Sequence, residues 1–314
     1  MSLLMKNILQ LISIFICFLL LGNSIVHAQT RKALLIGISK YQSYKPNAEW
    51  SDINGTNDIH LIADDLKNQG FEQITQLLDE QATCKTIIDE LKKLTQSASK
   101  GDIIYFHFSG HGQPVLVLNG DEGHADGWDE AIIPYDAGMI FQKDEYEGEN
   151  HIIDDQLEKF IFKLRKRVGE TGMVYVVLDA CYSGTGVRGD DEDDEEIDED
   201  APLRGVNVGF DYGEFKIYSP IVNHSSYYQI PKEKNYSDIV VLEACLPHQQ
   251  NREIKINDSY YGPLSYYIHE IIKNKIITKQ TSWIGDVINL FNADKRTFRQ
   301  KIVCESTIDN GKGY

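Results

Sequence analysis

An uninterrupted apolar run, Met173–Leu178, ends abruptly in Asp179 and Cys181 and is followed by serine, glycine and threonine residues. A short apolar run rich in β-branched residues and bounded by glycines is typical of a strand buried on both faces of a sheet. Such strands belong to parallel sheets, which bind ligands just beyond the carboxyl ends of their strands. Because side chains alternate along a strand, Asp179 and Cys181 should point to the same side. This stretch predicts a parallel sheet with a thiol at its ligand-binding edge.

A second stretch has the same form. The apolar and aromatic run Ile103–Phe108 leads into Ser109, and His111 follows two residues later. If this strand lies beside the one that ends near Cys181, the imidazole and the thiol meet at the same edge. That pairing supplies a nucleophile and its acid/base partner.

The rest of the chain alternates between strand-like and helix-like patterns. Further strands are expected at 31–39, 74–78, 238–245 and 300–305, and helices at 59–69, 83–96, 261–276, 283–293 and from Asp154 onward. Residues 112–150 form a long polar excursion between two of these elements. The alternation predicts one α/β domain in which helices cover both faces of a mostly parallel sheet.

The chain of 314 residues is acidic, with a formal net charge of −17, and this argues against non-specific binding of nucleic acid. Ten of the eleven residues from Asp190 to Asp200 are acidic, and the following residues to Asn235 show no sustained period. This composition predicts a solvated linker.

The first 28 residues have the pattern of an export signal. Lys6 precedes an apolar stretch over 8–22, and Val26 to Ala28 offer small residues for cleavage. A retained anchor is the alternative, but the apolar stretch is shorter than the roughly 20 residues that span a bilayer. We expect an exported, periplasmic or secreted protein without a stable membrane anchor after cleavage.

Four cysteines remain after that segment, namely Cys84, Cys181, Cys245 and Cys304. An even number in an exported protein is compatible with disulfides, although a chain this long can build its own core without them. The absence of any C-x-x-C pair makes a zinc cluster an improbable interpretation.

The motif S-G-H-G at one strand end, D-A-C-Y-S-G at another, and G-W-D-E-x-x-x-P-x-D between them resemble the caspase-like cysteine peptidases of family C14, and within these the metacaspases. The resemblance runs from about Arg31 to Glu305. It implies a caspase-like three-layer sandwich with a central, mostly parallel six-stranded sheet. It also implies a p20-type part over 29–189, a linker over 190–236 and a p10-type part over 237–314 that completes the same domain.

The resemblance further implies a cysteine endopeptidase whose catalytic dyad is His111 and Cys181. The backbone N–H groups of Gly112 and Cys181 would form the oxyanion hole, where glycine permits close approach of the substrate backbone.

Substrate choice in the metacaspases implies cleavage after Arg or Lys. The corresponding pocket residues here are Asp58, Ser109 and Asp179, which suit a guanidinium or an ammonium group. The family has cysteine in the turn where this chain has Gly55. A helix cap is the structural alternative for Asp58, and a simple strand-end acid is the alternative for Asp179.

Calcium is implied as an activator, with no cofactor strictly required. The positions that match the family's ligands are Asp129, Asp154 and Asp155, whose hard oxygen atoms suit Ca²⁺. A further family aspartate falls on Arg188 here, so that the set is incomplete unless Asp190 substitutes. Helix capping and loop ordering are the structural alternatives.

Arg188 and Arg204 flank the acidic run and are candidate sites of self-cleavage. We expect a monomer that acts on protein or peptide substrates. Two alternatives stay open at this point. One is a clostripain- or gingipain-like peptidase with the same dyad, and the other is a non-catalytic caspase-like binding module in which Cys181 is locked in a disulfide.

Overall fold

The computed structural model describes eight stretches of the chain, namely residues 29–43, 49–118, 127–182, 198–206, 208–214, 216–218, 225–297 and 299–308. The predicted export signal lies outside the described residues, as do Arg188 and Asp190. No helix in the described stretches is long and apolar enough to cross a membrane.

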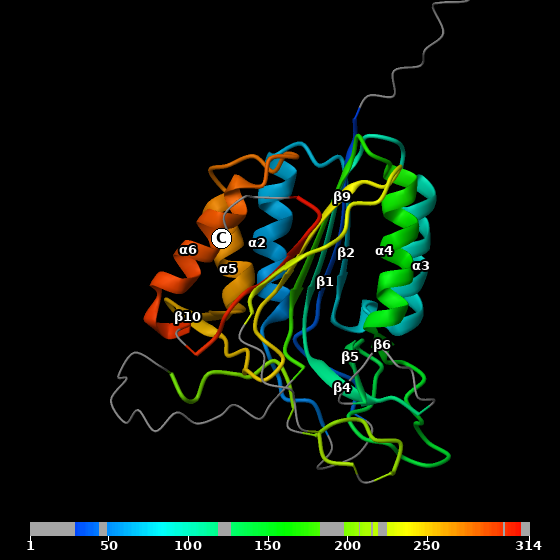
Figure 1. The fold of residues 1–314 in the computed structure, drawn as a ribbon. Helices are drawn as coiled ribbons and strands as arrows, with labels where there is room; N and C mark the ends of the chain where they lie inside the picture. Colours follow the sequence, from blue (N-terminus) through cyan, green and yellow to red (C-terminus); the bar gives the residue numbers. More distant parts are fainter. Residues whose placement is uncertain are drawn as a thin grey trace, which may run out of the picture.

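A seven-stranded sheet forms the centre of the molecule (Figure 1). Its order is β2 (Gln73–Leu78), β1 (Arg31–Gly37), β3 (Ile103–Ser109), β7 (Met173–Asp179), β9 (Asp238–Glu243), β12 (Val303–Ser306) and β8 (Tyr227–Gln229). The first five strands are parallel to one another, and β12 runs antiparallel to β9. The sheet therefore has one strand more than expected, because the short β8 lies within the predicted linker.

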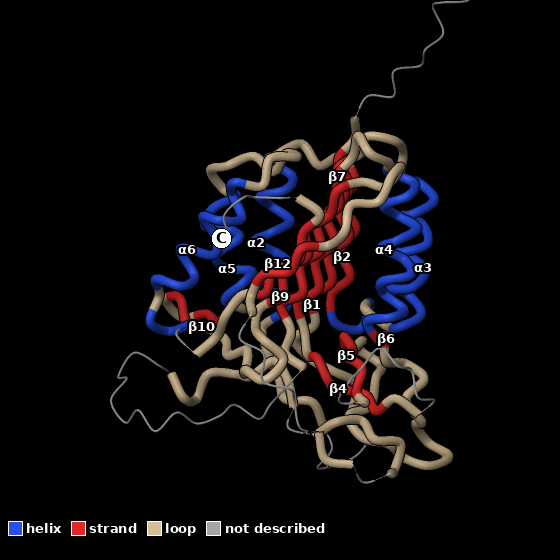
Figure 2. Tube along the Cα trace, in the orientation of Figure 1, coloured by secondary structure: helices blue, strands red, loops and turns tan. Residues whose placement is uncertain are grey.

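Helices cover both faces of this sheet (Figure 2). The helices α2 (Gly55–Asn68), α5 (Pro263–Ile272) and α6 (Ser282–Ala293) share one apolar core with the sheet. The helices α3 (Cys84–Ser97) and α4 (Asp154–Val168) share the other. Because β3 and β7 are completely buried between these layers, their strongly apolar sequences follow directly from their position. The three layers confirm the predicted caspase-like α/β fold.

A small antiparallel sheet lies below the carboxyl ends of the central strands (Figure 1). It contains β4 (Gly112–Leu116), β5 (Trp128–Ile132) and β6 (Ile152–Ile153), so part of the expected polar loop forms strands. The remaining elements are the hairpin of β10 (Ile254–Ile256) and β11 (Ser259–Tyr261) and the 3₁₀ turns η1 (Asp79–Gln81) and η2 (Lys295–Thr297).

Strand register aligns the two reactive segments. Strands β3 and β7 are adjacent and parallel, and Ser109 lies directly opposite Asp179. His111 lies two residues after Ser109, and Cys181 lies two residues after Asp179. The predicted catalytic residues therefore leave the sheet at neighbouring points of one edge.

Candidate active site

His111 and Cys181 are both buried at this edge, with 0 % and 1 % of their surfaces exposed. Backbone N–H groups of Gly112 and Cys181 converge on one carbonyl oxygen, that of Arg204, at 3.3 and 2.8 Å. A Cβ atom at Gly112 would come within 2.7 Å of the Cys181 carbonyl oxygen, so only glycine fits there without a shift of backbone. This pair of donors has the arrangement of an oxyanion hole.

The surroundings of His111 define which of its nitrogens is basic. Its Nε2 lies 2.9 Å from the carbonyl oxygen of Ser51, which can only accept, so that Nε2 must carry the proton. Its Nδ1 is buried and has no hydrogen-bond partner among the described residues. The ring stacks on Trp50 at a centroid distance of 5.0 Å. Nδ1 therefore keeps its lone pair available for a proton.

Burial also lowers the pKa of His111 to about 4, because an apolar environment disfavours the charged imidazolium. The imidazole is consequently neutral at neutral pH and can act as a base. Tyr41 fixes the backbone at this point, since its hydroxyl accepts a hydrogen bond of 2.6 Å from the His111 N–H.

The Cys181 thiol donates to the carbonyl oxygen of Gln249 at 2.9 Å. Cys245 lies beside it, and hydrogen bonding to Cys181 together with burial raises the pKa of the Cys245 thiol well above its ordinary value. Within the described part of the chain, all four cysteines outside the first 28 residues are thiols rather than disulfides. The alternative in which a disulfide locks Cys181 is therefore not supported by this arrangement.

The three predicted pocket residues converge on a guanidinium group, and this group belongs to the chain itself. The side chain of Arg204 is completely buried. Its Nη2 lies 2.7 Å from Asp58 Oδ2, and its Nη1 lies 3.5 Å from Asp179 Oδ1. Nη1 also donates to the Ser109 hydroxyl at 2.6 Å. Arg204 thus occupies the predicted specificity pocket.

A fourth pocket residue, Glu253, was not anticipated. Its Oε1 accepts hydrogen bonds from Arg204 Nε at 3.1 Å and from Nη2 at 2.7 Å. The residue follows β9 in a segment without a strand or helix period, and it carries no motif that would have identified it. Only the tertiary structure places this carboxylate in the pocket.

Neighbouring elements hold the pocket carboxylates in position. Asp179 Oδ2 accepts hydrogen bonds of 2.7 Å from both the N–H and the hydroxyl of Ser265, at the start of α5. Asp58 accepts a hydrogen bond of 3.0 Å from the Gly262 N–H. Asp58 lies in the first turn of α2, and the N-cap position is occupied by Asn54. Burial raises the pKa of Asp58 to about 7, although Arg204 opposes this shift.

The backbone around Arg204 pairs with neighbouring segments on both sides. The N–H of Arg204 donates to the Asn251 carbonyl at 2.9 Å, and the Glu253 N–H donates to the Pro202 carbonyl at the same distance. On the other side, Gly205 pairs with Gly112 in a parallel bridge. Pairing along an extended segment is how peptides add to a sheet edge, so residues 202–205 are bound in the manner of a peptide substrate.

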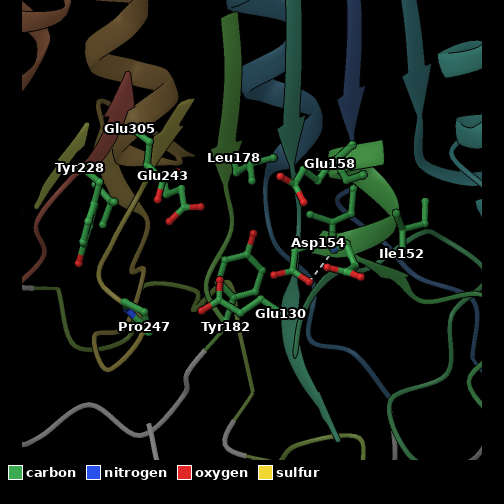
Figure 3. A pocket seen from close by; sticks show the side chains of 14 residues that line it. Glu130, Ile152, Asp154, Glu158, Leu178, Tyr182, Tyr228, Glu243, Pro247 and Glu305 are labelled. Atoms are coloured by element: carbon green, nitrogen blue, oxygen red, sulfur yellow. Dashed lines mark hydrogen bonds between the residues drawn. The ribbon is translucent and has the colours of Figure 1, made fainter. Parts of the chain in front are cut away.

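The calcium-ligand candidates are only partly brought together. Asp154 and Asp155 line an acidic pocket of about 350 Å³ with Glu130, Glu158, Glu243 and Glu305 (Figure 3). None of the described residues that line it carries a positive charge. Asp129 does not line this pocket, because neighbouring residues of β5 face opposite sides and Glu130 takes that place.

The donor chemistry of this pocket suits Ca²⁺, which prefers carboxylate oxygens. The arrangement does not form a preassembled site, since no group of three or more His, Cys, Asp or Glu residues in the described stretches is placed to hold a metal ion. Among the described residues, Asp129, Asp154 and Asp155 are therefore not gathered around one point.

Cysteine peptidases use a thiol and an imidazole together with two converging N–H donors, and all of these groups lie at one edge of this sheet. A sequence model described as "Metacaspase, peptidase C14 domain" matches residues 31–189, about half of the chain. The chain therefore belongs to the metacaspase family.

Individual metacaspases agree with this assignment. Metacaspase-1 of Plasmodium falciparum is 32 % identical over 164 residues, which cover 50 % of this chain and 24 % of that protein. Metacaspase-1 of Schizosaccharomyces pombe is 25 % identical over 274 residues, which cover 77 % of this chain and 60 % of that protein. The chain thus matches less than two thirds of the length of these relatives.

A solved structure shares the fold. The crystal structure of protein GSU0716 from Geobacter sulfurreducens superposes with a TM-score of 0.59 over 90 % of this chain and 96 % of that one. Its sequence identity is 20 %, so this similarity speaks for the architecture alone.

Proposed function

We propose that this chain is a cysteine endopeptidase that hydrolyses peptide bonds after arginine, and less efficiently after lysine. The observation that carries the proposal is the position of Arg204. Its guanidinium lies among buried carboxylates while its carbonyl oxygen accepts from the Gly112 and Cys181 N–H groups. This arrangement supports arginine as the residue that precedes the cleaved bond.

The chemistry follows from the groups at the edge. The Cys181 sulfur attacks the carbonyl carbon of the substrate, and His111 Nδ1 takes up the thiol proton. The Gly112 and Cys181 N–H groups stabilise the negative oxygen that develops. His111 then gives its proton to the leaving amine, which departs, and a water molecule hydrolyses the thioester. The Ser51 carbonyl keeps Nε2 protonated throughout, so Nδ1 is the nitrogen that exchanges the proton.

We also propose that the first substrate is the chain's own Arg204–Gly205 bond. Cleavage there would separate a p20-type part from a p10-type part inside the predicted linker. Arg188 remains a second candidate, and it lies outside the described residues. Replacing Arg204 with Gln should leave the chain intact. Unchanged processing of this variant would show that the chain is cleaved after another residue.

Calcium enters the proposal as an activator that binds the acidic pocket. Asp154 and Asp155 would be ligands, with Glu130 in the role that the sequence suggested for Asp129. Ca²⁺ would supply the positive charge that this pocket lacks. Titration calorimetry with Ca²⁺ on the Cys181→Ala protein tests this directly, and Asp154→Asn with Asp155→Asn should abolish the heat of binding.

The remaining parts of the proposal come from the sequence. An exported, monomeric enzyme that acts on protein or peptide substrates fits the amino-terminal signal pattern and the net charge of −17. Size-exclusion chromatography with light scattering, together with amino-terminal sequencing of exported protein, would test the monomeric state and the removal of residues 1–28.

The deciding assay uses residues 29–314 and fluorogenic peptides that end in Arg, Lys or Asp, with and without millimolar calcium. The Cys181→Ala protein is the control. Arginine cleavage that is lost in this variant supports the proposal. Cleavage after Asp would overturn the pocket assignment while keeping the dyad. Inactivity on every peptide, with Cys181 unreactive to thiol reagents, would favour a non-catalytic binding module.

A further inference from the structure

We propose that Glu253 makes this pocket select arginine over lysine. The inference rests on the proposed function, since it concerns the substrate residue that the peptidase accepts. It assigns to one carboxylate a task that Asp58 and Asp179 do not share.

The carboxylates of the pocket meet different parts of the guanidinium. Asp58 contacts the terminal nitrogen Nη2, and Asp179 lies near the terminal nitrogen Nη1. Among the described residues, only Glu253 bonds to Nε, at 3.1 Å, and the same oxygen accepts from Nη2 at 2.7 Å. This side-on pair of hydrogen bonds uses the fixed fork of the guanidinium.

Lysine cannot reproduce the bond to Nε. Its side chain has a methylene group at that place and a single ammonium group beyond it. The ammonium can still be attracted by Asp58 and Asp179, which meet the far end of the side chain. Glu253 would instead face a methylene and lose a charge-assisted hydrogen bond in a site closed to water. A site that is built to bond a polar group discriminates strongly against an analogue that lacks it.

Glu253 is held in place by groups other than Arg204. Its side chain is buried, with 2 % of the residue exposed. Asn54 donates to it twice, from the backbone N–H to Oε1 at 2.7 Å and from Nδ2 to Oε2 at 2.6 Å. The carboxylate is therefore oriented toward the pocket before a substrate arrives, and the discrimination needs no rearrangement.

The test compares two peptides that carry the chain's own Ala201–Leu203 sequence followed by Arg or Lys and a fluorogenic group, assayed with the processed enzyme. We expect the wild type to prefer Arg by tenfold or more in kcat/KM. Glu253→Gln should lower kcat/KM for the Arg peptide by roughly tenfold to a hundredfold, because a charge-assisted hydrogen bond is lost. The same substitution should change kcat/KM for the Lys peptide by less than about threefold. Asp58→Asn is the matched control and should weaken both peptides to a similar extent.

A second measurement needs no variant and so does not depend on the folding of Glu253→Gln. A peptide whose terminal arginine has a methylene in place of Nε keeps the positive charge and both terminal nitrogens as an amidine. The wild type should cleave it roughly tenfold less well than the arginine peptide. Equal cleavage of the two, or an Arg-to-Lys ratio that Glu253→Gln leaves unchanged, would overturn the inference while the peptidase proposal stands. Failure of the wild type to cleave either natural peptide would overturn both.

Discussion

His111 illustrates how single contacts set the chemistry of this edge. The Ser51 carbonyl fixes the proton on Nε2, and stacking on Trp50 keeps the ring buried. Burial favours a neutral imidazole, although the hydrogen bond to Ser51 partly opposes this effect, and the fixed tautomer leaves Nδ1 to receive the thiol proton. In the proposed mechanism, a backbone carbonyl and an aromatic face therefore set the state of the base, and neither belongs to a sequence motif.

Asp58 should make binding of basic ligands depend on pH. Burial raises its pKa to about 7, so a substantial fraction is protonated and neutral at neutral pH. Only the ionised form attracts a guanidinium, and affinity should therefore increase as pH rises through about 7. The inhibition constant of agmatine, a non-reacting guanidinium ligand, measured with the processed enzyme, should fall between about pH 6 and about pH 8. In Asp58→Asn this part of the pH dependence should disappear, and its persistence would assign the titration to another group.

Fast self-cleavage should require a residue without a side chain at position 205. A Cβ atom at this position would come 2.5 Å from the Cys181 carbonyl oxygen and 3.1 Å from Cys181 Cβ. Gly205→Ala must therefore displace the bond that is to be cut, and a displacement of about 1 Å can cost on the order of a hundredfold in rate. We expect processing of the intact chain to slow at least about tenfold, as followed by intact-protein mass spectrometry. Val206→Ala, one residue later, should process normally, and equal rates for the two variants would contradict this reading.

At the scale of elements, the site depends on the beginning of α5 as much as on the strands. Pro263 lies in the first turn of this helix, and the Ser265 N–H and hydroxyl both reach Asp179. The unbonded N–H groups of a helix amino terminus favour a negative charge nearby. The amino terminus of α5 thus stabilises the carboxylate of Asp179, which lies at the end of β7.

Ser265→Ala should weaken this support. The Ser265 hydroxyl donates to Asp179 at 2.7 Å and lies 3.0 Å from His107 Nε2, so its removal affects two buried partners. We expect the free energy of unfolding to drop by about 1–3 kcal/mol and KM for an arginine peptide to rise more than kcat changes. Chemical denaturation and steady-state kinetics give the two readouts. Ser237→Ala is the matched control, because that hydroxyl is buried without a hydrogen-bond partner among the described residues; a similar loss there would point to a general packing effect.

At the scale of the whole molecule, cleavage of the linker should not separate the two parts. Strand β9 pairs with β7, and α5 packs against α2, so the amino-terminal and carboxyl-terminal parts share one sheet and one apolar core. After processing, both fragments should elute together from a size-exclusion column at the position of the intact chain. Separation without denaturant would show that the parts are independently folded.

The central strands and the placement of His111 and Cys181 at one edge of the sheet could be predicted, because complete burial leaves a strongly apolar run. Strand β8 could not, since two of its three residues are only partly buried, the third is exposed, and the strand carries no such run. The position of Glu253 depends on tertiary contacts with Asn54 and Arg204, which local patterns do not encode. Likewise, alternation along β5 allows only one of Asp129 and Glu130 to face the acidic pocket, and the sequence does not say which one.

Intact-protein mass spectrometry of residues 29–314 during incubation with calcium, beside the Cys181→Ala protein, tests most directly whether Arg204 is presented to Cys181 for cleavage. Self-processing predicts one cut that depends on Cys181, with a new carboxyl terminus at Arg204 and a new amino terminus at Gly205. An intact chain after prolonged incubation, a first cut elsewhere, or the same cut in Cys181→Ala would contradict it.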